Sequence, residues 1–161
     1  MKMIKKLIMR ALWLRRGVVS AANAVADGTH DSFLSKLADA ALAARYLLVQ
    51  FGTDGDHVAV ADASHAAIGP CYEAPSANDV TTGVPVRIGI LGKGPTKLMV
   101  ASAAVLVGAV LIQDAAGKVK TLPTSGGGTG IVVGRALSAA SGDGEVLEVQ
   151  DVVPYLVTIA T

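Results

Sequence analysis

The residues that could carry out chemistry are concentrated in one short stretch. Three acidic residues and two histidines fall between Asp54 and His65. Asp62, Ser64 and His65 are the residue types of a hydrolytic triad, in which a histidine activates a serine and a carboxylate orients the histidine. A triad needs these groups to converge in space beside an oxyanion hole, which neighbouring positions in a sequence do not achieve. The stretch therefore argues against a hydrolase, although His57 and His65 are the histidines that one would use.

The acidic residues of the same stretch also resemble the start of a calcium-binding loop. Asp54 and Asp56 flank a glycine, but such a loop needs further oxygen ligands and a glutamate at its twelfth position. The twelfth position here is His65. Asp54 and Gly55 lie between two apolar runs, and Asp-Gly is a preferred hairpin turn. We therefore expect a surface turn that closes a hairpin, with no metal site.

A glycine-rich stretch, TSGGGTGIVVG at residues 124–134, is a third candidate because such loops can hold phosphate. A phosphate loop ends in Gly-Lys-Ser/Thr and opens a helix, and a dinucleotide fingerprint also leads into a helix. Here the glycines lead into IVVGRAL, which is typical of a strand. The pattern favours a plain loop, and we expect no catalytic residue, no cofactor and no small-molecule substrate.

The composition favours one domain with a core of small side chains. The chain has 161 residues, of which 52% are apolar and only 4% aromatic. Cys71 is the single cysteine, so an internal disulfide is excluded, and nothing near it has the spacing of a zinc or redox site. We expect Cys71 to be a half-buried thiol on a strand.

The charges divide the chain into a basic arm and an acidic body. From residue 17 onward, eight basic and thirteen acidic residues give 8 − 13 = −5. An acidic body with few aromatics argues against nucleic-acid binding. The basic residues that precede the first acid are Lys2, Lys5, Lys6, Arg10, Arg15 and Arg16.

Residues 1–16 have the pattern of an amphipathic helix, with apolar and basic side chains at helical spacing on opposite sides. Such a helix could be a secretory signal, a membrane-surface helix or a docking arm. Arginines interrupt the apolar run of about 7–15 residues that a signal needs, although SAANA at residues 20–24 resembles a cleavage site. No window approaches the run of about 18 apolar residues of a membrane-spanning helix.

Residues 17–27 resemble a linker, so we divide the chain into an arm with linker (1–27), a second segment (28–45) and a body (46–161).

Residues 28–45 are expected to be helical, with an extended arm as the alternative. Thr29 could cap a helix in which Leu34, Leu37, Ala38 and Ala41 share one side.

After Arg45 the helical period ends, and short apolar runs alternate with turn clusters. This spacing predicts a mainly β fold, either a small β-barrel or a sandwich, with an N-terminal helical or extended arm. In VPVRIGI, alternate residues face the core, while Pro85 and Gly89 favour an edge or bulged strand. The strands are expected at residues 46–51, 57–61, 67–72, 84–90, 97–101, 105–112, 119–122, 131–136, 145–149 and 155–159.

The order of several phrases along the body resembles the capsid cement, or head decoration, proteins of phages and prophages. The phrases are RYLLVQFG, DHVAV, VPVRIGILG, AAVLVGAVLIQDAAGKV and GRALSAASGDGEVLEV. The resemblance runs from about residue 27 to residue 157, and it excludes residues 1–24. None of the phrases is a catalytic signature.

The resemblance implies a β-rich domain, often trimeric, on the outside of an assembled phage head. Its partner would be the major capsid protein of a tailed phage, which it would cross-link without a reaction or a cofactor. It would be found on the virion exterior, and in the host cytoplasm during assembly. As possible capsid-docking residues of the segment before Tyr46 we take Lys5, Lys6, Arg10, Arg15, Arg16, Phe33, Leu34 and Leu37.

Two other functions remain open. The chain could be a secreted or membrane-surface binding module that uses residues 1–24 as a signal or anchor. It could also be a small hydrolase that uses His57 or His65.

Overall fold

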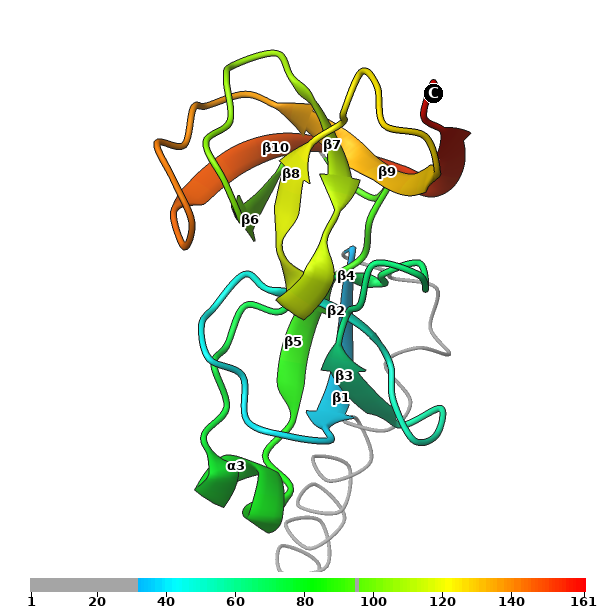
Figure 1. Cartoon of the computed structure of the whole chain (residues 1–161). Helices are drawn as coiled ribbons and strands as arrows, with labels where there is room; N and C mark the ends of the chain where they lie inside the picture. The colour runs from blue at the N-terminus through cyan, green and yellow to red at the C-terminus, as the bar shows by residue number, and fades with distance from the viewer. Residues whose placement is uncertain (1–31, 95) are drawn as a thin grey trace, which may run out of the picture. The chain divides into compact units, whose positions relative to one another are not determined.

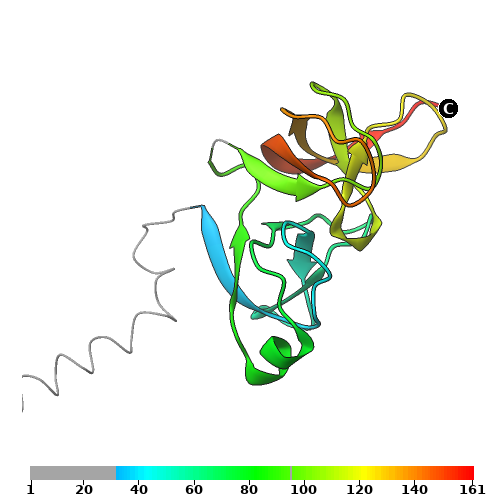
Figure 2. The same cartoon turned by 90° about the vertical axis from the view of Figure 1, so that its left-hand side faces the viewer.

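The computed structural model describes residues 32–94 and 96–161. Within this part, residues Ser32–Thr161 form one compact unit of ten strands in two five-stranded sheets (Figures 1 and 2). The mainly β expectation is confirmed. No helix in the described part is long and apolar enough to cross a membrane.

The first sheet has the strand order β4-β2-β3-β1-β5. β1 lies parallel to β3 and antiparallel to β5, while β2 forms the predicted hairpin with β3 around Asp54 and Gly55. The strands are β1 (Phe33–Ala38), β2 (Leu48–Phe51), β3 (His57–Val60), β4 (Gly69–Pro70) and β5 (Val86–Gly89).

The second sheet has the strand order β6-β10-β9-β7-β8, and every pair in it is antiparallel. Its strands are β6 (Lys97–Val100), β7 (Val110–Gln113), β8 (Val119–Thr121), β9 (Thr129–Ala136) and β10 (Val146–Thr158). The two strands expected at residues 145–149 and 155–159 are one long strand, β10, whose register with β9 shifts between Asp151 and Tyr155. The first glycines of the glycine-rich stretch lie in the loop between β8 and β9, and the rest of the stretch belongs to β9, as the sequence indicates.

The structure corrects the helix expected over residues 28–45. Residues 33–38 form β1, in the sheet between β3 and β5, so the extended alternative is the correct one there. The spacing of Leu34 and Leu37 fits a helix, but pairing with two neighbouring strands overrides this local pattern.

One short helix, α3 (Ala77–Thr82), was not expected from the sequence. Ser76 caps it by accepting a hydrogen bond from the main-chain N–H of Asp79, and the Asp79 carboxylate accepts one from the main-chain N–H of Ser76. Gly83 ends the helix with a φ of 69°, a left-handed conformation that glycine adopts readily. A single turn of 3-10 helix, η1 (Ala115–Gly117), also lies between β7 and β8.

The first two residues of β2, Leu48 and Val49, are buried on opposite faces of the strand and belong to two different apolar clusters. Leu48 packs into the larger cluster with Met99, Leu111 and other residues of the second sheet, whereas Val49 packs into a smaller cluster. Cys71 belongs to the smaller cluster and is fully buried, not half-buried as expected, and this burial raises the pKa of its thiol. The larger cluster thus joins the two sheets.

Gln113 adds a polar connection between the two sheets. Its side chain is 2% exposed; its Nε2 donates to the carbonyls of Asp62 and His65, and its Oε1 accepts from the Ala67 N–H at 3.0 Å. β7 therefore fixes the segment that leads into β4.

Replacing Gln113 with leucine is expected to lower the free energy of unfolding by roughly 2–4 kcal/mol, because main-chain groups lose partners that buried groups need. Chemical denaturation of the Gln113→Leu protein would measure the loss. Gln150→Leu, at an exposed position of β10, is the control. Equal stability of the two variants would contradict the assigned role of Gln113.

Candidate docking surface

The first acid-histidine pair forms a turn. Asp54 Oδ1 accepts hydrogen bonds from the main-chain N–H of Asp56 at 2.8 Å and pairs with His57 Nδ1 at 2.8 Å. The contact lowers the pKa of Asp54 and raises the pKa of His57. Asp54 and Asp56 are both exposed. Within residues 32–94 and 96–161, no three His, Cys, Asp or Glu side chains are grouped so as to hold a metal ion.

The second pair does not have the order of a catalytic triad. Ser64 Oγ donates to Asp62 Oδ1 at 2.8 Å, and His65 Nδ1 lies 2.9 Å from Asp62 Oδ2. The carboxylate also accepts from the main-chain N–H groups of Ser64 and His65. These bonds hold the pKa of Asp62 well below its usual range. In a triad the histidine lies between serine and acid, whereas here Asp62 is the centre of the turn.

A different set of side chains gathers on the first sheet, where β1 and β5 pair. Phe33 is opposite Gly89, and Ser35 is opposite Arg87, so Phe33 and Arg87 are diagonal neighbours. The Arg87 guanidinium lies 4.9 Å from the centre of the Phe33 ring and 5.4 Å from that of Tyr72. Such stacking of arginine on aromatic rings is attractive and holds the side chains in place.

Gly89 makes room for the Tyr72 ring. A Cβ atom at this position would lie 2.8 Å from Cε2 and 3.0 Å from the hydroxyl oxygen of Tyr72. The rings of Phe33 and Tyr72 meet edge to face at a centroid distance of 5.3 Å, a favourable aromatic geometry. The main-chain N–H of Tyr72 donates to the Arg87 carbonyl at 2.9 Å, which ties the ring to β5. Partial burial raises the pKa of Tyr72.

Two residues before β2 complete the set. Tyr46 has a φ of 67°, which is uncommon for a residue with a side chain, and its ring meets Tyr72 edge to face at 5.8 Å. Arg45 stacks 5.2 Å from the centre of the Tyr46 ring, and its Nε donates to the Tyr72 carbonyl at 2.6 Å. We call the five residues Phe33, Arg45, Tyr46, Tyr72 and Arg87 the aromatic–arginine cluster.

The arginines of this cluster have no acidic partner in the described part of the chain. The lysines at 36, 97, 118 and 120 each lie within ion-pair distance of an aspartate, whereas Arg45 and Arg87 do not. Both are exposed. Arginine and tyrosine are enriched among the residues that dominate protein–protein binding. The cluster is therefore suited to bind carboxylates on another protein.

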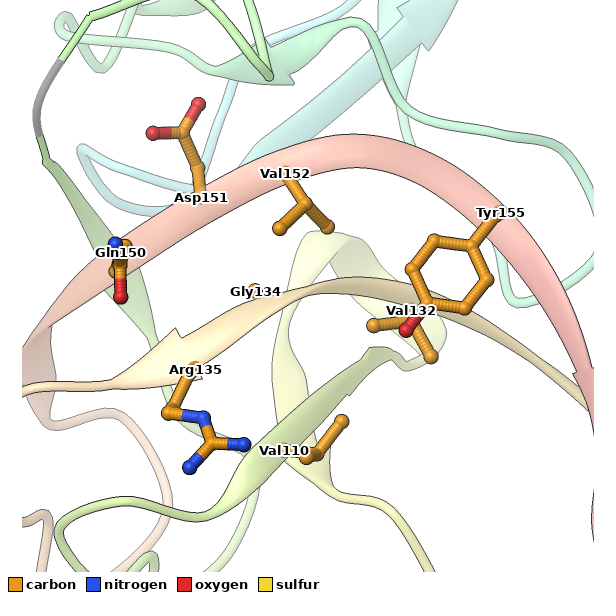
Figure 3. A pocket seen from close by; sticks show the side chains of 8 residues that line it. All are labelled: Val110, Val132, Gly134, Arg135, Gln150, Asp151, Val152 and Tyr155. Atoms are coloured by element: carbon orange, nitrogen blue, oxygen red, sulfur yellow. The ribbon is translucent and has the colours of Figure 1, made fainter.

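The third arginine of the described residues, Arg135, lies on the second sheet beside a hollow of about 280 Å³. Figure 3 shows Arg135, Val110 and Tyr155 around this hollow, with the Asp151 side chain pointing away from it. Arg135 is exposed and stacks on no ring in the described residues. It differs from Arg87 in lacking aromatic support.

The structure places only part of the docking set taken from the sequence. Phe33 is 41% exposed and belongs to the cluster, while Leu34 packs against the smaller core cluster and Leu37 is half-buried on β1. The basic residues Lys5, Lys6, Arg10, Arg15 and Arg16 lie outside the described residues.

Sequence reasoning missed the other four members of the cluster. The alternation in VPVRIGI does place Arg87 on the face away from the core. The meeting of Arg87 with Phe33 depends on the pairing of β1 with β5, which are separated by about fifty residues and by three other strands. No local spacing indicates this contact.

Comparison with known proteins shows a likeness of fold. No protein-family model matches the chain, and no curated protein sequence matches it. The fold is similar to that of the crystal structure of the head fiber gp8.5 N base in bacteriophage phi29, with a TM-score of 0.52 and 16% sequence identity. The match covers 74% of this chain and 92% of the phage chain. The likeness shows a shared fold.

Proposed function

We propose that this protein is a structural component of a tailed-phage virion. In this role it binds the outer surface of the assembled head and stabilises it by linking neighbouring major capsid subunits. The observation that carries the proposal is the likeness of its fold to a phage head fiber base over most of both chains. The resemblance of the sequence to head decoration proteins, which rests on different evidence, supports the same role.

The aromatic–arginine cluster is the surface that we assign to the capsid. Its rings are held by edge-to-face contacts and its arginines by stacking, so little side-chain entropy is lost on binding. Guanidinium groups that have no carboxylate partner in the described part of the chain favour an acidic surface on the capsid subunit. The basic arm of residues 1–16 adds further positive charge for the same partner.

Stabilisation of the head then follows from mass action. A protein that binds assembled subunits and not free ones adds its binding free energy to the assembled state. The protein would bind as homotrimers that are repeated over the lattice. Each homotrimer would contact several capsid subunits, and this adds avidity. This role needs no reaction and no cofactor.

Co-sedimentation with purified heads tests the proposal. Expanded heads that lack the protein are mixed with increasing amounts of the full chain, and unexpanded shells serve as the control. The proposal expects saturable binding to expanded heads, with a stoichiometry set by the repeated lattice sites. Absence of binding to either particle would reject the capsid role and would favour a binding module of another kind.

A further inference from the structure

The end of β10 is a long apolar segment that leaves the core. Up to Asp151 its residues alternate between exposed and buried, as a strand on the surface of a core does. Beyond that point no residue of β10 is buried, and Val153, Tyr155 and Leu156 are all more than half exposed. Tyr155 and Leu156 are adjacent and so point to opposite faces of the strand. Neither face of this end is therefore fully covered by the described residues.

One edge of this end is also open. β9 pairs with β10 from Val149 to Thr158, but β6 on the other side pairs only with residues 146–149. Gly92 lies against Val153, and Pro154 has no N–H to donate. From Tyr155 onward the second edge has no strand beside it in the described part of the chain (Figure 1). An open apolar edge is a template for pairing or packing with another chain.

Neither this end of β10 nor the part of β9 that pairs with it carries a charged side chain, although Arg135 and Tyr155 line the same hollow. Residues 152–161 contain none, and neither do residues 121–134, which include the loop before β9 and most of β9 itself. The two stretches pair with each other between residues 129–132 and 155–158. Most surfaces that remain in water carry charges to prevent association. The uncharged end of β10 therefore suits a partner that is itself neutral and apolar.

A second copy of this chain is such a partner. Interfaces within homo-oligomers are more apolar than those between transient partners. Copies of one uncharged surface meet without electrostatic repulsion, whereas an acidic capsid surface would leave charges unpaired against it. The charged contacts suited to the capsid lie on the first sheet, in the aromatic–arginine cluster.

We infer that the uncharged end of β10, residues 152–158, is the surface through which copies of this protein associate with one another. The side chains of Val153, Tyr155 and Leu156 supply the apolar contact, and the open edge after Pro154 supplies main-chain donors and acceptors. The inference rests on the homotrimer of the proposed function and names its contact surface. Its test needs no phage heads.

Two exposed leucines give a matched pair of variants. Leu156 is 71% exposed at the end of β10, and Leu106 is 79% exposed in the turn before β7. Each is replaced by glutamate in the full chain, and the mass in solution is measured by sedimentation equilibrium over a range of concentrations. Tyr155→Lys is a second variant of the same surface, and circular dichroism verifies that each protein is folded.

The expected result is a multimeric wild-type protein and a multimeric Leu106→Glu variant. Leu156→Glu and Tyr155→Lys should each weaken association by ~30-fold or more, as expected when a central contact is lost. A monomeric wild-type protein would overturn the inference, and so would folded variants of β10 that associate as the wild type does. A monomer that still binds heads would overturn this inference alone, whereas a multimer that binds no heads would reject the capsid role alone.

Discussion

Replacing Arg87 with glutamate is expected to weaken binding to expanded heads by ~30-fold or more, the effect of losing a dominant interface residue. The guanidinium lies 4.9 Å from the centre of the Phe33 ring and has no carboxylate partner in the described residues. Charge reversal removes the stacking and places an acid against a surface that we propose to be acidic. Titration of heads with labelled protein, followed by sedimentation, measures the change in Kd.

Arg135→Glu is the matched control for this prediction. It makes the same change of charge at an exposed arginine on the other sheet, which no aromatic ring supports in the described part. Its affinity for heads should stay within ~3-fold of the wild type, as most peripheral positions do. Equal losses from the two variants would mean that only net charge matters, and this would contradict the docking role of the cluster.

The Lys97→Met variant is expected to lose roughly 3–5 kcal/mol of folding stability, because it leaves a buried carboxylate without its cation. The side chains of Lys97 and Asp151 are 3% and 0% exposed, and their Nζ and Oδ2 atoms are 3.7 Å apart. Lys97 Nζ also donates to the Lys93 carbonyl at 2.5 Å, and Asp151 Oδ2 accepts from the Gly92 N–H at 2.7 Å. Asp151 Oδ1 has no hydrogen-bond partner in the described part, so Asp151 depends strongly on Lys97.

The double variant Lys97→Met/Asp151→Leu tests the reason for this loss. Removing both charges removes the unpaired carboxylate, so the double variant should be more stable than Lys97→Met alone. Urea denaturation of the wild type, both single variants and the double variant completes the cycle. A double variant that loses the sum of the two single losses would show that the pair is not coupled.

Much of the β fold follows from local pattern. The alternation in VPVRIGI predicts β5, and Asp54-Gly55 predicts the turn between β2 and β3. In contrast, the strand expected at residues 105–112 begins only at Val110, because the chain turns through Gly108 at a φ of 82°. The cap of α3 has a local signal, Ser76 three residues before Asp79, that could have indicated the helix.

Long-range pairing decides what local pattern could not. Residues 33–38 have the leucine spacing of a weak helix, yet parallel pairing with β3 and antiparallel pairing with β5 place them in a sheet. The same pairing brings Phe33 to Arg87. The candidate docking surface thus depends on strand order, which a single sequence does not encode in any short segment.

The proposed role is tested most directly by imaging heads with and without the protein. Reconstructions by cryo-electron microscopy of expanded heads, before and after addition of the full chain, would be subtracted from one another. We expect difference density on the outer surface at regularly repeated positions, fitted by residues 32–161 with the aromatic–arginine cluster against the capsid. Heads that are identical in the two reconstructions, or density that contacts the shell only through other surfaces, would contradict the role proposed here.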